Sequence, residues 1–187
     1  MRGKVLSVGL LVGAMLLAGC GGKGGASGGG GGSAIYDAAA RGDDAAIREA
    51  VAAGADVDAP GRADRTGLFI AVYNKNVRTA QTLLDLGADP VAADKNGKTP
   101  LMYAASRGYN DLLKSMLAKR PNVNAQDKGG YTAAHHAGTM GNTEGLNLLK
   151  AAGADMTLRD KVGRTADELA YAKAQQSAVG AATAPAK

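Results

Sequence analysis

A 33-residue period is the feature of this sequence that most restricts its possible folds. A serine or threonine recurs at this interval without insertion, at Ser33, Thr66, Thr99, Thr132 and Thr165. A pair of small residues and then a pair of aliphatic residues follow each of the first four. Fixed periods of about 20–50 residues are typical of solenoids, in which every repeat is one supersecondary unit. The period therefore predicts a stack of short units that are stabilised mainly by their neighbours.

The segment Thr99–Tyr131 shows the structure expected of one unit. Thr99 is suited to cap the start of a helix, and Pro100 is suited to its first turn. Gly108 tolerates the positive φ at which helices commonly end, and a second helix is predicted from Asn110 to Lys119. Two such helices cannot bury their apolar faces alone, so neighbouring units must pack together.

The Thr99-Pro100-Leu101 start, the small-residue pairs, Gly108 and the recurring Gly-Ala-Asp turns resemble the ankyrin repeat. The resemblance covers about residues 33–173. It implies an all-α solenoid of helix–turn–helix units with hairpin loops, spanning residues 33–176. Four full repeats start at residues 33, 66, 99 and 132, and a C-terminal half-repeat cap starts at residue 165. Residues 177–187 are expected to be a disordered tail.

Some positions depart from the pattern of the ankyrin family. Lys75 replaces the glycine between the two helices of the second unit, and Asp64 replaces the glycine of a hairpin. Arg120-Pro121-Asn122 replaces the Gly-Ala-Asp turn of the third unit. The characteristic histidine of the family is present only as His135. These departures predict reduced stability, with the second and third units most affected.

The first 19 residues have the composition of a secretory signal, with Arg2 and Lys4 before an uncharged run. This run, about 14 residues long, is shorter than the roughly 20 residues that span a bilayer. The sequence Leu17-Ala18-Gly19-Cys20 resembles the lipobox of bacterial lipoproteins. The resemblance implies removal of residues 1–19 and lipidation of Cys20, the only cysteine. The alternative is an ordinary signal peptide followed by an incidental cysteine.

Residues 20–32 are predicted to be the lipidated cysteine and a flexible, glycine-rich tether. Because Gly21 follows Cys20, the lipoprotein resemblance implies sorting to the outer membrane. The expected location is therefore the bacterial cell envelope, with the folded part facing the periplasm. Apart from the covalent lipid, no cofactor is expected.

In the ankyrin family, partners contact mainly the hairpin tips and the concave face of the first helices. Matched to the repeats of this chain, these positions imply twelve partner-binding residues. They are Arg62, Arg65, Tyr73, Asn74, Lys95, Lys98, Arg107, Lys128, Tyr131, Met140, Lys161 and Arg164. Their basic bias predicts an acidic protein partner, with Tyr73, Tyr131 and Met140 as apolar anchors.

A second interpretation is that the charged tips only keep the repeats soluble. Four nearby aspartates would then weaken their field at physiological salt. These are Asp64, Asp94, Asp127 and Asp160.

Catalytic motifs are absent from the sequence: there is no Ser/His/Asp order, phosphate loop or zinc-ligand spacing. His135 and His136 are adjacent, so on a helix they point about 100° apart and cannot share a metal ion as i, i+4 histidines can. We expect His135 to be structural and His136 to be an ordinary exposed residue.

The leading prediction is therefore a monomeric, non-enzymatic protein-binding module in the envelope, which would scaffold, inhibit or neutralise its partner. The first alternative is a structural envelope lipoprotein whose basic strip contacts anionic lipid headgroups or cell-wall polymer. The second is an enzyme or metal protein that uses His136. Nucleic acid is not an expected partner, because the net charge is only +5 and tryptophan is absent.

Overall fold

The computed structural model describes residues 34–182, which contain nine α-helices, one short 3-10 helix and no strand. The helices form four antiparallel pairs and one unpaired C-terminal helix. Their bounds are α1 Ala34–Arg41, α2 Asp44–Ala52, α3 Gly67–Tyr73, α4 Val77–Asp85, α5 Pro100–Arg107, α6 Asn110–Leu117, α7 Ala133–Met140, α8 Thr143–Ala151 and α9 Ala166–Ala182, with the 3-10 helix η1 at Arg62–Asp64.

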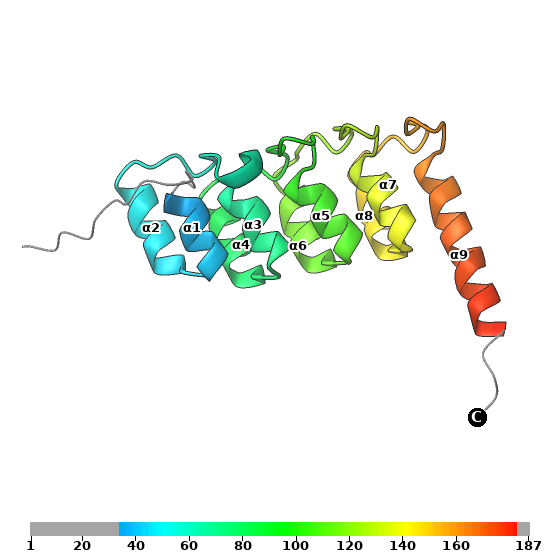
Figure 1. Ribbon diagram of the computed structural model, residues 1–187, viewed down its shortest axis with the longest axis horizontal. Coiled ribbons are helices and arrows are strands. Elements are labelled where there is room, and N and C mark those ends of the chain that lie inside the picture. The colour runs from blue at the N-terminus through cyan, green and yellow to red at the C-terminus, as the bar shows by residue number, and fades with distance from the viewer. Residues whose placement is uncertain (1–33, 183–187) are drawn as a thin grey trace, which may run out of the picture.

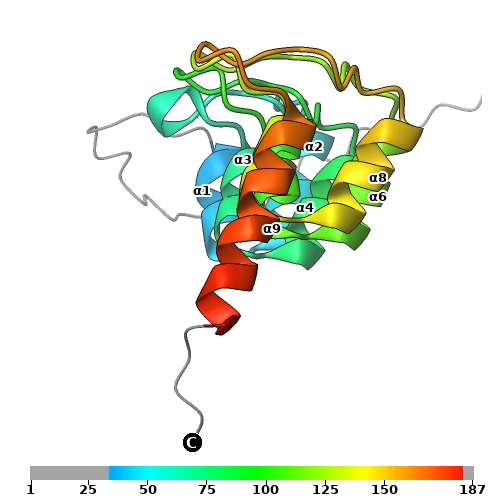
Figure 2. The same ribbon diagram turned by 90° about the vertical axis from the view of Figure 1, so that its right-hand side faces the viewer.

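The helices are arranged in two parallel rows (Figure 1). Helices α1, α3, α5, α7 and α9 stack in one row, and α2, α4, α6 and α8 stack in the other. The hairpin loops follow one edge of this stack. Figure 2 shows that they overhang the first-row helices on the side away from the second row. This arrangement confirms the predicted all-α solenoid, and we call the side beneath the hairpins the inner face.

Buried threonines begin the helices of the first row. The side-chain oxygens of Thr66, Thr99 and Thr132 each accept a hydrogen bond from the backbone N–H three residues later, at 3.3, 3.1 and 3.4 Å. Such caps contribute about 1 kcal/mol each. Gly108 and Gly141 end α5 and α7 with φ values of 70° and 73°, as the sequence predicted for Gly108.

The periodic apolar residues form one continuous core. One set comes from the first-row helices, and another comes from the second-row helices. The first contains Ala38, Ala71, Ala104 and Ala137, and the second contains Leu83, Met116 and Leu149; all are buried. Because each residue recurs after 33 positions, stacking places chemically similar groups beside one another in successive units.

Two predicted boundaries were wrong. Helix α6 ends at Leu117, two residues before the predicted end, because the chain turns through Arg120 with a positive φ of 53°. Helix α9 continues to Ala182, so residues 177–182 are helical, whereas a disordered tail was predicted from residue 177. The sequence after residue 176 is rich in alanine, which favours helix strongly.

Several predicted features lie outside the described residues. They are the signal peptide at 1–19, Cys20, the tether at 20–32, the first repeat start at Ser33, and residues 183–187 of the predicted tail.

The departures from the repeat pattern coincide with left-handed backbone. Lys75, Asp64 and Arg120 have φ values of 62°, 60° and 53°, and Ala63 also has a φ of 60°. Residues with a Cβ atom adopt this conformation at a cost of about 1–2 kcal/mol. Lys75, Asp64 and Arg120 thus keep the positive φ of the equivalent glycines and place strain in these turns.

Candidate binding surface

Three hairpins contain an aspartate that holds their backbone. Oδ1 of Asp94, Asp127 and Asp160 accepts hydrogen bonds from the N–H groups two and four residues later, at 2.8–3.0 Å. All three carboxylates are buried or nearly so. They were expected to lie among the exposed tip charges, and instead they turn into the loops as structural acceptors. Asp64, the fourth, remains exposed.

Backbone hydrogen bonds also connect neighbouring hairpin tips. The N–H of Lys95 donates to Ala63 at 3.2 Å, and the N–H of Lys128 donates to Asn96 at 3.0 Å. The N–H of Lys161 donates to Gly129, also at 3.0 Å. The cationic tip residues Arg62, Lys95, Lys128 and Lys161 all remain exposed. The fold therefore places four predicted partner-binding residues on successive tips.

An aromatic and cationic cluster covers the inner face of the second and third units. The guanidinium of Arg65 lies 4.9 Å from the ring centre of Phe69 and 5.4 Å from that of Tyr73. The rings of Tyr73 and Tyr103 lie 5.2 Å apart. Arg107 lies 5.0 Å from the Tyr103 ring centre and donates to its hydroxyl at 2.6 Å. Tyr73 is nevertheless 48% exposed and free to contact a partner.

Two adjoining hollows open on the inner face of the third and fourth units. Their volumes are about 530 and 450 Å³, and both are lined by Lys98, His136 and Met140. Arg107 lines the larger hollow, and Lys128 lines the smaller one. Predicted partner-binding residues from two units and two hairpins are thus brought together. The sequence interpretation did not include Met102 and Tyr103, which also line the larger hollow.

His136 differs from its predicted role as an ordinary exposed residue. Its side chain is only 17% exposed, and its Nε2 donates to Oδ2 of Asp127 at 3.0 Å. Burial lowers the pKa of His136, and the charges of Lys98 and His135 lower it further, against the opposing effect of Asp127. The neutral imidazole therefore joins α7 to the hairpin before it.

The structural role predicted for His135 is confirmed. This buried side chain accepts from the N–H of Thr132 through Nδ1 at 3.2 Å. Its Nε2 contacts the carbonyl oxygen of Arg164 at 3.1 Å. His135 therefore links the start of α7 to the next hairpin.

Other predicted partner-binding residues are already engaged within the protein. Arg164 donates to Asp160 at 3.0 Å through Nε and to the Tyr131 hydroxyl at 2.6 Å. Burial tends to raise the pKa of Asp160. Hydrogen bonds from the backbone and guanidinium of Arg164 outweigh this effect and lower that pKa to about 2. Arg65 pairs with Asp94 at 3.6 Å. These arginines therefore contribute less free positive charge than the sequence pattern indicated.

Asn74 has a contact that sequence spacing did not reveal. Its side-chain amide donates to the carbonyl of Ala40 at 3.2 Å and thereby connects the first two units. The side chain remains exposed, so it can also be reached by a partner.

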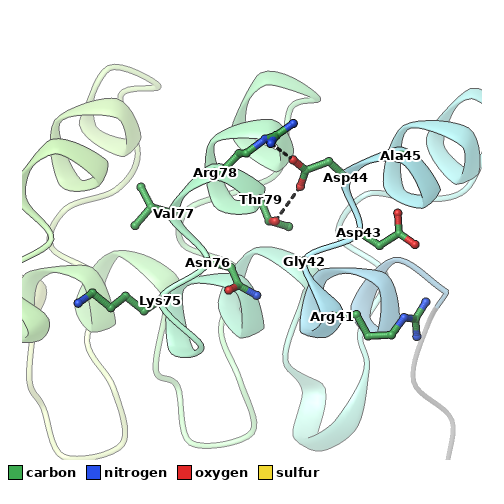
Figure 3. Close-up of a pocket in the computed structure, with 10 residues that line it drawn as sticks. All are labelled: Arg41, Gly42, Asp43, Asp44, Ala45, Lys75, Asn76, Val77, Arg78 and Thr79. Atoms are coloured by element: carbon green, nitrogen blue, oxygen red, sulfur yellow. Dashed lines mark hydrogen bonds and ion pairs between the residues drawn. The ribbon is translucent and has the colours of Figure 1, made fainter.

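A further hollow of about 630 Å³ lies at the turns between the helices of the first and second units (Figure 3). Asp44 accepts there from Thr79 at 2.7 Å and pairs with Arg78 at 3.0 Å. None of the twelve predicted partner-binding residues lines this hollow. Its strongest polar contacts join neighbouring units, so we assign it a structural role.

Two features are absent from residues 34–182. In this part of the chain, no three His, Cys, Asp or Glu side chains lie together in a way that could hold a metal ion. Within the same residues, no helix combines the length and apolar character needed to cross a membrane.

Known proteins resemble this chain over part of its length. It is 33% identical to inversin of Gallus gallus over 91 residues, which are 48% of this chain and 8% of inversin. It is 36% identical to L-asparaginase of Dirofilaria immitis over 78 residues, 42% of this chain and 13% of that protein. It is also 37% identical to palmitoyltransferase AKR1 of Debaryomyces hansenii over 67 residues, 36% of this chain and 8% of that protein. The chain thus spans a small fraction of each relative.

Family models match most of the residues that the structure describes. A model described as ankyrin repeats in three copies matches residues 68–160, and one described as ankyrin repeats in many copies matches residues 35–84. Ankyrin repeats generally mediate interactions between proteins and are typically non-enzymatic. The period, the paired helices and these matches agree, and the chain belongs to the ankyrin-repeat family.

Proposed function

We propose that this chain is a non-enzymatic module that binds an acidic protein surface in a bacterial cell envelope. The hairpin tips and the inner face form the binding surface. A lipid on Cys20 holds the module at the outer membrane, facing the periplasm, and residues 21–32 give it freedom to reach its partner.

The main support is the separation of charges along the hairpins. The cations at Arg62, Lys95, Lys128 and Lys161 are exposed, whereas three hairpin aspartates turn inward and accept backbone hydrogen bonds. Positive charge on an exposed row speeds encounter with an acidic partner. Tyr73 and Met140, 48% and 58% exposed, offer apolar contacts that slow dissociation.

Capture from cells tests the protein-binding part of the proposal. Lys95, Lys98 and Lys128 are changed together to glutamate in the full chain, and envelope proteins that co-purify are identified by mass spectrometry. The matched control changes Lys75, Lys119 and Lys150 to glutamate; these are exposed and lie outside the hairpins and the inner face. We expect the first variant to lose its partner and the control to retain it.

Two results would contradict this part of the proposal. Equal capture by both variants would show that the basic surface is not the binding site. Salt-sensitive binding to anionic liposomes or sacculi, without any captured protein, would instead support a structural envelope lipoprotein.

The anchor is tested separately through Cys20. Two or more acyl chains give stable membrane attachment, whereas a single chain binds reversibly. We expect the unchanged protein to incorporate labelled palmitate and to fractionate with the outer membrane. Cys20→Ser should do neither; a Cys20→Ser variant that stays in the membrane fraction would exclude the lipid anchor.

A further inference from the structure

The larger inner-face hollow contains two cations from different elements. Lys98 lies at the end of a hairpin and Arg107 lies at the end of α5, and both are exposed. Among the side chains that the structure describes, neither has a carboxylate partner. Arg107 contacts only the ring and hydroxyl of Tyr103.

Asp127, the acidic residue of the adjoining hollow, forms no ion pair with Lys98 or Arg107. Asp127 lines the adjoining hollow, but its carboxylate accepts from the N–H groups of Gly129 and Tyr131 and from Nε2 of His136. All of these acceptor contacts are internal, and the side chain is almost fully buried. Lys98 and Arg107 therefore lack an internal counter-ion and can receive one from a ligand.

Apolar groups lie directly beside these cations. Met140 is 58% exposed, and Met102 and the ring of Tyr103 form the other apolar parts of the lining. Methionine side chains are flexible and polarizable, so they adapt to aliphatic and aromatic partners alike. The two hollows share Lys98, His136 and Met140, so they adjoin and together draw their lining from two units.

We infer that the two hollows form a binding site for an extended peptide segment in which an acidic residue stands next to a bulky apolar residue. The carboxylate lies between Lys98 and Arg107, and the apolar side chain packs on Met140 and Tyr103. This inference rests on the proposed function, since it specifies which part of a protein partner is recognised. It places the decisive charges inside the inner face, whereas the tips serve mainly to speed encounter.

Selection from a phage library of random peptides tests this inference, with the full chain purified in mild detergent at physiological ionic strength. We expect the enriched peptides to carry Asp or Glu beside Leu, Ile, Phe or Met. Fluorescence anisotropy with one enriched peptide should show about tenfold or greater weakening for Lys98→Glu combined with Arg107→Glu. The same double variant should select peptides that carry Lys or Arg instead.

Lys150→Glu is the matched control, because Lys150 is an exposed cation on α8, away from the hairpins and the inner face, and lines neither hollow. It should leave peptide affinity within about threefold, because salt screens an exposed charge that lies far from the site. Enriched peptides without acidic residues, or unchanged selection by the double variant, would overturn the inference and leave a protein-binding function intact. Failure to enrich any peptide would also overturn it, whereas the proposed function is decided by capture of whole proteins.

Discussion

The first described hairpin and the last are held by different means. In the last, Asp160 accepts two backbone N–H groups and pairs with Arg164. In the first, the equivalent position is Gly61, which has no side chain to accept them. That hairpin instead passes through Ala63 and Asp64, both with φ of 60°. The first hairpin therefore keeps the backbone hydrogen bond from the N–H of Gly61 to Arg65 but passes through a strained 3-10 turn, whereas the last is held by the carboxylate of Asp160.

The reason for this difference lies in the first helix. A Cβ atom on Gly61 would lie 2.3 Å from Cγ of Tyr36, well inside the distance of any real contact. The buried ring of Tyr36 thus occupies the space that an aspartate would need. Packing between units can therefore override the local hydrogen-bonding pattern of a repeat.

This comparison also concerns function, because the inner-face hollows lie between the hairpins that contain Asp94 and Asp127. Both of these hairpins have the internal aspartate acceptor. A surface that is already ordered loses less entropy when it binds. The binding residues with the best internal support are therefore those of the third and fourth units.

The largest expected effect comes from Gly138→Ala at the C-terminal end. An added Cβ would lie 2.4 Å from the carbonyl oxygen of Ala166, so α9 would have to move away from α7. We expect the free energy of unfolding to fall by about 1–3 kcal/mol. Helix propensity alone predicts that the free energy of unfolding rises, because alanine is a better helix former than glycine. Urea denaturation measures the change, and a stabilised variant would show that α9 does not pack so closely.

The next effect is expected from removing a hairpin acceptor. Asp127→Ala leaves two backbone N–H groups and His136 without their partner, and should cost about 2 kcal/mol of stability. The contrasting variant is Gly61→Asp, which restores the missing aspartate of the first hairpin. This variant should lower the thermal stability of the protein, because the new side chain would collide with the ring of Tyr36. Thermal unfolding compares the two, and stabilisation by Gly61→Asp would contradict our explanation of that hairpin.

Relief of backbone strain should give a smaller effect of opposite sign. Lys75→Gly and Arg120→Gly each place glycine where φ is positive, and should raise stability by up to about 1 kcal/mol. Lys119→Gly, next to one of these sites but without positive φ, is the control and should not stabilise the protein. If both Lys75→Gly and Arg120→Gly lost stability, backbone strain at these two positions would not be what destabilises the protein.

The smallest expected effect concerns pH. The pKa of His136 is lower in the folded protein, mainly because of burial, so the unfolded chain binds a proton more readily. Stability should therefore decrease as pH falls below about 6.5, the ordinary pKa of histidine, because the unfolded state then takes up that proton. His136→Gln can still donate to Asp127 but does not titrate, and should have a flatter profile. Equal slopes for His136→Gln and the unchanged protein between about pH 7.5 and 5.5, one unit either side of that pKa, would contradict the assignment.

The sequence predicted most of the fold because its signals were local and periodic. The capping role of Thr99, the positive φ of Gly108 and the structural role of His135 all follow from their places in the repeat. The end of α9 was missed because the alanine-rich sequence from residue 177 was interpreted as a frayed tail, although alanine favours helix.

The candidate site was harder to predict because its key contacts cross between elements. The sequence identified Lys98, Arg107 and Met140 by repeat position, but not the hollow that they share with Tyr103. The bond between His136 and Asp127 joins a helix to the hairpin before it and needs the folded geometry. The inward turn of the hairpin aspartates is different, because an aspartate three residues before each hairpin glycine is a local signal for a side-chain turn of this kind.

The most direct test of the proposed inner-face site is site-specific photocrosslinking in cells. A photoreactive phenylalanine analogue replaces Met140 on the inner face, or Lys150 on exposed α8 as a control. We predict a discrete crosslinked protein from position 140 and none from position 150. Crosslinks from position 150 alone, or from position 140 to lipid alone, would contradict our assignment of the inner face as a protein-binding surface.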